Sequence, residues 1–499
     1  MKNKFIISFV FIFLLMPVVS VLPSEAKLFL KKQKKEEINL NLDAQAEIVK
    51  NGVLSLEDCI NIALQNDPNL KISKFNIDTQ KSKVTQAKSD YFPSLNGATS
   101  FNFQNNQNSY NGFNNDNNSN NYQINVGINE LIWNFGKTFA SINMEKYTLE
   151  SKRYDKDYQE LNTIYKVKSA YYNVLAAIAN LDIYQRSVRI NKINYDRTKA
   201  LYEEGLKSQI DVVNSEVYLT DAEIQLVEAK NKYKACIIDL NNAMYLVGAP
   251  KYKVLSTEKF KLPDEYIKNN ENEINVSNIN IKNKVLSSNT DQVLTSDIKQ
   301  EKIIQGYVFK PYEIEFEDLV QKAYENRPDL KSLQLVAKAS KESLKVLKRS
   351  YLPSLNVSAG YNFRDSSNFN TSGLSLSTSL DIPVLNFLDI KAKINEMNSY
   401  LDIALENVNL SKKNIYFEVE KCFINLDTLA NKIPLLETKV SQTLENFKLA
   451  DGRYTVGLGN FIELQDAQTN YNNAQLSYVQ TVFNYNMAKA QLEWVLGEK

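Results

Sequence analysis

The 499-residue sequence contains no histidine. This absence excludes histidine-based catalytic triads, imidazole proton transfer and histidine metal sites, although carboxylate or cysteine–lysine chemistry would survive it. Only three cysteines are present, Cys59, Cys236 and Cys422, and they are far apart with no Cys-x-x-Cys pair. So sparse and odd a set favours neither a disulfide framework nor a zinc site, and it is typical of small apolar side chains packed on helices.

The chain also lacks an excess of charge of one sign. Lys and Arg number 59 against 58 Asp and Glu, so no strong net field favours nucleic acid as a partner. The sequence has no Gly-rich phosphate loop and no cluster of metal-ligating residues. We therefore expect a protein that is not an enzyme and that uses no cofactor or metal.

Long apolar runs are missing except at the start of the chain. Two lysines precede that run, and Ser24 and Ala26 follow it with the small-x-small spacing of a secretory cleavage site. We expect a signal peptide over 1–26, followed by a Lys-rich extension over 27–53. The alternative is a retained anchor helix, because the run is nearly long enough to span a membrane. Any other membrane crossing would have to use strands.

The sequence does contain one pattern of residues that occurs twice. Residues 91–103 read YFPSLNGATSFNF, and residues 351–363 read YLPSLNVSAGYNF. Further along, ALYEEGLKSQIDVVNSE (200–216) aligns with GRYTVGLGNFIELQDAQ (452–468), which places Gly205 on Gly457. The duplication predicts two repeats of one design.

The repeats are predicted to cover 54–250 and 311–499, joined by an Asn/Lys-rich linker over 251–310. The second pair of aligned segments is eight residues closer together than the first, which indicates a longer loop in the first copy, over the Asn-rich segment 104–121.

In each repeat the sequence predicts a short helix, a second helix that starts at a proline, a β-hairpin, a very long helix and a final helix that runs back along the long one (the returning helix). Pro68 and Pro328 are in the first turn of the second helix, where proline is tolerated. The predicted bounds are about 55–66 and 315–326 for the short helices, 95–104, 122–132, 355–364 and 373–383 for the strands, 137–204 and 389–456 for the long helices, and 209–247 and 460–496 for the returning helices. Pro434 is expected to kink the second long helix.

The hairpins alternate apolar and polar residues with period two. Phe101 and Phe103 share one face while Asn102 lies on the other, and Tyr361 and Phe363 repeat this in the second copy. An ordinary amphipathic hairpin on a soluble core would show the same alternation. In the last helix, Leu464, Tyr471, Tyr478 and Tyr485 recur every seven residues, which predicts a coiled-coil seam.

Four strands cannot close a barrel, and open sheet edges cannot lie in lipid. If the hairpins are in a membrane, the chain must therefore oligomerise. Three copies would supply twelve strands, with the apolar face toward lipid and a polar, water-filled lumen.

With these features together, the sequence resembles the TolC family of outer-membrane efflux channels. The resemblance rests on the duplicated Tyr-[Phe/Leu]-Pro-Ser-Leu phrase and on the paired Gly-Leu turns, and it covers nearly all of the chain beyond the extension. It implies a mainly α protein with a twelve-stranded membrane β-barrel, built as a homotrimer with a periplasmic helical tunnel. It also implies no catalysis, and as partners a periplasmic adaptor, an inner-membrane pump or ABC exporter, and the lipid of the outer membrane.

The resemblance carries over to individual residues. Gly205-Leu206 and Gly457-Leu458 would form the two periplasmic turns where the adaptor docks. Glu463 and Asp466 would line the periplasmic constriction, and Asp211 and Tyr454 would form a contact that holds the entrance closed. Gly459 occupies the position of a second, arginine-based lock, so that lock is not matched. Phe101, Phe103, Tyr361 and Phe363 would face lipid.

Taken without the resemblance, these residues also fit plain helix C-caps and a solvated acidic helix face. A secreted trimeric coiled-coil fibre or adhesin without a channel is the alternative to an export duct, because it would share the long helices and the signal peptide. It would not need matched amphipathic hairpins in two halves. The sequence therefore favours the exit duct of a tripartite efflux or type I secretion system and does not identify its cargo.

Overall fold

A computed structural model describes residues 53–110, 113–247, 252–254, 315–366, 369–383 and 387–499. The predicted signal peptide, all but the last residue of the extension and most of the predicted linker lie outside these residues. Residues Ser55–Val247 and Val254–Lys499 form one compact unit, to which all the long elements belong. Two very short strands, β1 (Val53–Leu54) and β4 (Lys253–Val254), pair with each other.

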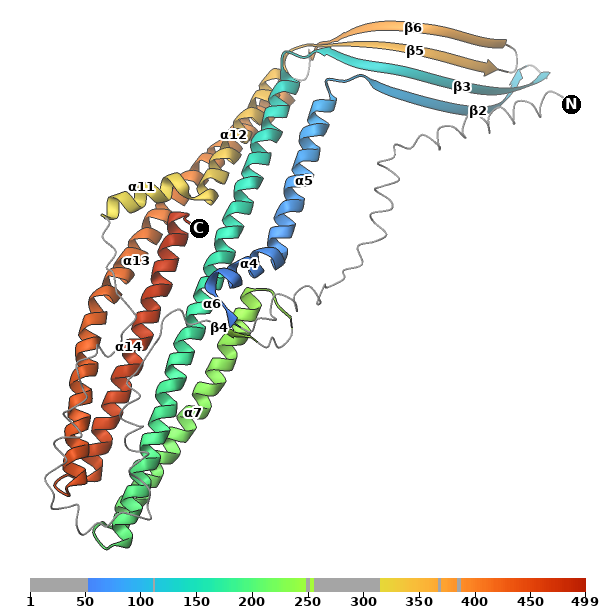
Figure 1. Cartoon of the computed structure of the whole chain (residues 1–499). Helices are drawn as coiled ribbons and strands as arrows, with labels where there is room; N and C mark the ends of the chain where they lie inside the picture. The colour runs from blue at the N-terminus through green and yellow to red at the C-terminus, as the bar shows by residue number, and fades with distance from the viewer. Residues whose placement is uncertain (1–52, 111–112, 248–251, 255–314, 367–368, 384–386) are drawn as a thin grey trace. The chain divides into compact units, whose positions relative to one another are not determined.

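The same order of elements occurs twice along the chain, as the duplication predicts (Figure 1). The first series comprises α4 (Leu56–Asn66), α5 (Pro68–Ser89), β2 (Ser94–Tyr110), β3 (Phe113–Trp133), α6 (Lys137–Glu203) and α7 (Gln209–Ala243). The second comprises α11 (Phe316–Asn326), α12 (Pro328–Arg349), β5 (Ser354–Ser366), β6 (Phe369–Asp381), α13 (Phe387–Thr455) and α14 (Phe461–Leu496). The mainly helical class and the repeated architecture are confirmed.

The start of each second helix is fixed by a capping residue that also contacts a long helix. Asp67 accepts a hydrogen bond from the backbone N–H of Asn69 at 2.8 Å, and its other oxygen accepts one from the Thr163 hydroxyl of α6 at 2.5 Å. At the equivalent position of the second repeat, Arg327 is paired with Asp329 and with Glu418 of α13. Both junctions are thus anchored through buried polar groups, with charges of opposite sign in the two repeats.

The four long strands form one antiparallel sheet in the order β2-β3-β5-β6. Residues paired across neighbouring strands share a face of the sheet: Phe101 is opposite Tyr122, Ile124 opposite Phe363 and Tyr361 opposite Leu374. The other face carries asparagine, glutamine, serine and threonine, for example the pair Asn125–Asn362. Apolar residues from both repeats therefore form one continuous face.

The first hairpin is longer than the sequence indicated. The segment 104–121 was expected to be a loop, yet β2 and β3 continue into it and pair as far as Tyr110 with Phe113. Backbone hydrogen bonds between strands do not depend on side-chain type, so an Asn-rich segment can extend a ladder that its apolar neighbours begin. The dipeptide Asn111-Gly112 was the available signal, because Asn-Gly is the preferred two-residue hairpin turn.

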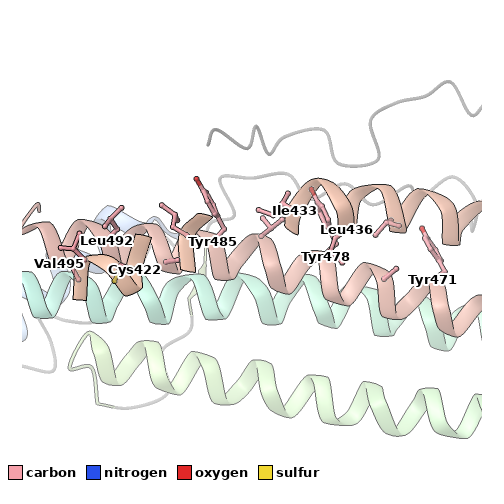
Figure 2. Packing of buried hydrophobic residues seen from close by; sticks show 14 of the residues in the cluster. Cys422, Ile433, Leu436, Tyr471, Tyr478, Tyr485, Leu492 and Val495 are labelled. Carbon is pink, nitrogen blue, oxygen red and sulfur yellow. The ribbon is translucent and has the colours of Figure 1, made fainter. Parts of the chain in front are cut away.

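The long helices pack as two antiparallel pairs, α6 with α7 and α13 with α14, and α6 also contacts α5, α12 and α14. Leu464, Tyr471, Tyr478 and Tyr485 are all buried in one apolar cluster with α13, which confirms the predicted seam. Figure 2 shows three of these tyrosines along one side of α14, beside Ile433 and Leu436 of α13. The ring of Tyr471 stacks on Phe447 at 6.1 Å between centroids.

Several smaller features complete the fold. Cys59, Cys236 and Cys422 are unpaired and buried, as expected for apolar packing. Helix α13 continues through Pro434, and the kink predicted there stays a prediction. Within the described ranges, the structure has no helix whose length and apolarity would let it cross a membrane.

Candidate functional site

The two turns that end the long helices have the same backbone design. At Gly205 and Gly457 φ is +74° and +78°, in the left-handed region that glycine enters without strain. In the first turn Leu206 N–H donates to the carbonyl of Leu201 at 2.8 Å, and in the second Leu458 N–H donates to that of Arg453 at 2.9 Å. Both are Schellman motifs, so the glycines lie at the helix ends where the sequence put them.

The leucine after each glycine is mostly exposed, 62% for Leu206 and 77% for Leu458. An aliphatic side chain at the tip of a helical hairpin leaves its apolar area in water, where a partner could cover it. Each turn therefore presents one exposed leucine at its tip, and adaptor docking there stays a prediction.

The returning helices begin at capped residues that are equivalent in the two repeats. Ser208 caps α7, and the carboxylate of Asp211 accepts hydrogen bonds from the Ser208 N–H at 3.2 Å and hydroxyl at 2.8 Å. Asn460 caps α14 by accepting from the N–H of Glu463 at 2.7 Å. Asp211 and Glu463 hold the same third position, but only the Asp211 carboxylate is engaged in a capping box.

The structure gives the Tyr454 hydroxyl a partner different from the predicted Asp211. Tyr454 is 1% exposed, and its hydroxyl is hydrogen bonded to that of Thr198 in α6 at 2.8 Å, with either group able to donate. Asp211 is instead held by Ser208 in its capping box. Burial raises the pKa of Tyr454, and the negative charge of the nearby Asp211 acts in the same direction.

Two further groups hold Tyr454 in place. The ammonium of Lys207, in the first turn, lies 4.5 Å from the centre of the Tyr454 ring, within the range of a cation–π contact. Phe461, the first residue of α14, packs edge-on against the same ring at 5.9 Å. The end of α13 therefore contacts both the turn between α6 and α7 and the first residue of α14.

A series of polar contacts continues this connection along α6. Arg197 forms an ion pair with Asp451 of α13 at 2.9 Å, Asn194 donates to Gln468 of α14 at 3.1 Å, and Asn472 donates to Ser187 at 3.0 Å. We call the Arg197–Asp451, Thr198–Tyr454 and Asn194–Gln468 contacts the hairpin lock. It joins the long-helix hairpin of the first repeat to that of the second, within one chain.

Sequence reasoning missed the α6 side of this lock, although a signal exists. Ser187, Asn191, Asn194 and Thr198 are all buried, and their spacing of four, three and four residues puts them on one face of α6. A stripe of small polar residues at core spacing is unusual in a long helix and predicts polar partners across the interface.

The acidic residues of the predicted constriction lie on one exposed face of α14. Glu463 and Asp466 are three residues apart and both exposed. The Glu463 carboxylate is 3.4 Å from the Nε of Arg453, an ion pair in which both side chains are about half exposed. At Gly459 an added Cβ would be 3.0 Å from the backbone nitrogen of Tyr454, so a larger residue there would require a small shift of the turn.

Comparison with known proteins agrees with this architecture. A family model described as outer membrane efflux protein matches residues 59–244 and 319–498. The chain is 18% identical over 456 residues to the probable efflux pump outer membrane protein TtgC of Pseudomonas putida, covering 89% of this chain and 83% of TtgC. It is 22% identical over 439 residues to outer membrane protein TolC of Escherichia coli, covering 87% and 80%.

Among solved structures, the fold matches that of CusC, described as forming a transmembrane channel, with a TM-score of 0.70. The identity is 15%, and the match covers 89% of this chain and 92% of CusC. The two parts of the family match lie within the two predicted repeats, and together they cover more than half of the chain. The chain belongs to the outer membrane efflux protein family.

Proposed function

We propose that the chain forms the outer-membrane exit duct of a tripartite efflux or type I secretion system. In this role it is a passive conduit, opened at its helical turns by other components. Membership of the outer membrane efflux protein family supports the membrane and the general task. The observation that carries the proposal is the four-stranded sheet, because both repeats contribute apolar residues to one face and polar residues to the other.

The open edges of that sheet support a homotrimer. β2 and β6 each pair with one described strand only, so each leaves one edge of the sheet open. An unpaired edge in a membrane leaves backbone N–H and C=O groups without partners, at several kcal/mol for each group. Three copies joined edge to edge give a twelve-stranded barrel that has no free edge.

The helices support the same assembly. On α7, Ile210, Val217 and Ile224 are seven residues apart and each more than half exposed. On α13, Ile403, Leu410, Phe417 and Ile424 form a second such series. Apolar residues repeated every seven positions form coiled-coil seams, and these point away from the chain's own core. Neighbouring copies in a helical tunnel would cover them.

The hairpin lock is the proposed closed-state contact. An adaptor that docks on Leu206 and Leu458 would separate the two hairpins at their turns, which breaks the contacts of Arg197 and Thr198 with α13. Gln468 Nε2 and Asn191 Oδ1 are buried at this interface without hydrogen-bond partners within the described chain. Unpaired buried polar atoms lower the net stability of an interface, which suits a contact that must open.

Conductance in planar bilayers, with mass measured by light scattering in detergent, tests the duct. We expect a trimer that inserts and shows a small resting conductance. A second measurement tests the lock by charge exchange: Arg197→Asp should raise resting conductance, and adding Asp451→Arg should restore the closed level. A monomer without conductance would contradict the duct, whereas a conducting trimer unaffected by Arg197→Asp would contradict only the lock.

A further inference from the structure

All four helix–strand junctions lie at one end of the sheet. β2 begins at Ser94 and β5 at Ser354, whereas β3 ends at Trp133 and β6 at Asp381. The pairing of Ser354 with Asp381 and of Leu355 with Trp133 places these ends together. Figure 1 shows α5, α6 and α12 meeting the sheet at this end. Arg349 of α12 donates to the carbonyl of Gly136 at 2.5 Å and so ties the two repeats together there.

Exposed aromatic side chains gather at these junctions. They occur in both repeats, just before β2 and β5, at the last residue of β3 and just after it: Tyr91, Phe92, Tyr351, Trp133 and Phe135. Such aromatics mark the interface between the hydrocarbon layer and the headgroups in membrane proteins. From Leu95 to Phe103 the apolar face extends for roughly 26 Å of strand, close to the ~25 Å apolar band of outer-membrane barrels.

Basic residues outnumber acidic ones at the same junctions. Four basic residues lie within seven residues of the strand ends on this side (Lys88, Lys137, Lys348 and Arg349). The acidic residues over the same stretches, strand ends included, are Asp90 and Asp381. The three lysines are exposed, whereas Arg349 is half-buried and engaged with Gly136. We call Lys88, Lys137 and Lys348 the basic collar.

Helix capping does not account for the whole collar. Lys88 and Lys348 are in the last turns of α5 and α12, where a cation is favoured by the helix dipole. Lys137, however, is the first residue of α6, where the dipole disfavours a cation, and the first turn of α6 contains no acidic residue.

We propose that the basic collar binds the phosphate groups of anionic phospholipids, of the phosphatidylglycerol type, in the leaflet next to the helices. This inference rests on the proposed function, because it requires the sheet to be in a bilayer. Exposed lysines beside an aromatic belt are placed at headgroup depth, where a phosphate is within reach of a lysine side chain. The collar would thereby fix the depth of the barrel in the bilayer and make its position there depend on the charge of the lipids.

Native mass spectrometry of the purified full-length oligomer tests the proposal. The protein in neutral detergent is offered equal amounts of phosphatidylglycerol and phosphatidylcholine with the same acyl chains. We expect the wild type to retain several-fold more phosphatidylglycerol, with a preference that falls as salt rises. The triple variant Lys88→Gln/Lys137→Gln/Lys348→Gln should lose it, by up to about fivefold for each lysine.

A matched control removes three exposed lysines that are distant in sequence from the junctions, Lys71, Lys74 and Lys230. This Lys→Gln triple variant has the same change in charge and should keep the preference. An equal preference in the collar variant and the wild type would overturn the proposal, as would a wild type that does not discriminate between the lipids. A wild type that binds neither lipid and does not conduct would instead contradict the proposed function.

Discussion

The hydroxyls of Tyr454 and Thr198 lie 2.8 Å apart, although 256 positions separate the two residues in sequence. This buried contact joins the end of α13 to the end of α6, and both helices turn back within ten residues of it. It is the part of the hairpin lock that single substitutions can test most cleanly, because neither residue is charged at neutral pH.

Replacing Tyr454 with Phe, or Thr198 with Val, should raise the resting conductance of the reconstituted channel. Either change removes one buried hydrogen bond, about 0.5–1.5 kcal/mol per copy, and takes away the partner of the hydroxyl that remains. Thr198→Ser keeps the hydroxyl and should conduct like the wild type. If Tyr454→Phe and Thr198→Val both stay at the wild-type level, this contact does not hold the entrance closed.

The turn at Gly457 offers a comparison between two glycines five residues apart. Neither Gly452 nor Gly457 has an atom within 4 Å of an added Cβ, so no clash distinguishes them. Gly457 has a positive φ, so Gly457→Ala should strain the turn by about 1–2 kcal/mol. Gly452 is inside α13, where Gly→Ala should stabilise by about 0.5–1 kcal/mol.

Export assays in cells measure the consequence. Gly457→Ala should lower export while the amount of protein in the outer membrane is unchanged, and Gly452→Ala should leave both at the wild-type level. The role of the turn in docking would be contradicted by normal export in Gly457→Ala cells.

Much of the fold could be predicted because its signals are local or repeated. The period-two alternation around Phe101 and Tyr361 determined which residues share a face, and the seven-residue spacing from Leu464 to Tyr485 determined the buried side of α14. Gly205 and Gly457 could be placed because a left-handed residue at a helix end has few alternatives. Each of these features depends on residues close together in sequence.

The partner of Tyr454 could not be predicted in the same way. Thr198 and Asp211 are both near the first turn, and the choice between two acceptors depends on how α6 rotates against α13. Ser208 also competes with Tyr454 for the Asp211 carboxylate, because its hydroxyl, three residues earlier in the chain, donates to that carboxylate in a capping box. A local hydrogen bond costs little chain entropy, so it takes the group that a long-range contact would otherwise use.

The two faces of β2 predict opposite outcomes for the same new side chain. Phe103→Arg puts a charge on the apolar face and should impair membrane assembly, at about 2–4 kcal/mol per copy near mid-depth. Asn102→Arg puts it on the polar face and should assemble normally but change conductance. Fractionation of the outer membrane measures the first effect and bilayer recording the second. Equal insertion of both variants would show that the assigned faces are wrong.

Alkaline pH should loosen the seam between α13 and α14. Burial raises the pKa of Tyr471 to about 12 and that of Tyr478 to about 12, against an ordinary value near 10. The folded state therefore binds the phenol protons of Tyr471 and Tyr478 more tightly than the unfolded state does. The stability that these two neutral side chains contribute is fully present below pH 10 and is lost as pH rises to 12.

Thermal unfolding in detergent, followed by circular dichroism from pH 9 to pH 12, measures this loss. The wild type should become less stable across the range by about 1–3 kcal/mol per tyrosine at most. Tyr471→Phe/Tyr478→Phe should be less stable at pH 9 but show a flatter decline. Replacing the exposed Tyr400 with Phe should leave the slope unchanged. An identical slope in the double variant would mean that other groups control alkaline unfolding.

The acidic face of α14 carries the sharpest prediction. In a trimer, Glu463 and Asp466 would place six carboxylates around one narrow entrance, where like charges attract cations to offset their repulsion. The closed channel should therefore prefer cations and be blocked by multivalent cations added on the side of the helical turns. Glu463→Gln/Asp466→Asn should abolish the block without opening the pore, because neither residue belongs to the hairpin lock.

Arg453 gives this prediction an internal control. Its guanidinium lies beside the Glu463 carboxylate. An ion pair this exposed adds little to stability, but the positive charge of Arg453 still offsets part of the negative charge of the six carboxylates. Arg453→Gln should strengthen multivalent block, since it leaves three more uncompensated negative charges at the entrance. Tyr454→Phe should instead raise resting conductance and leave the block intact. Bilayer recordings of the three variants decide between the two roles: if Glu463→Gln/Asp466→Asn is blocked like the wild type, this face is merely solvated and the constriction lies elsewhere.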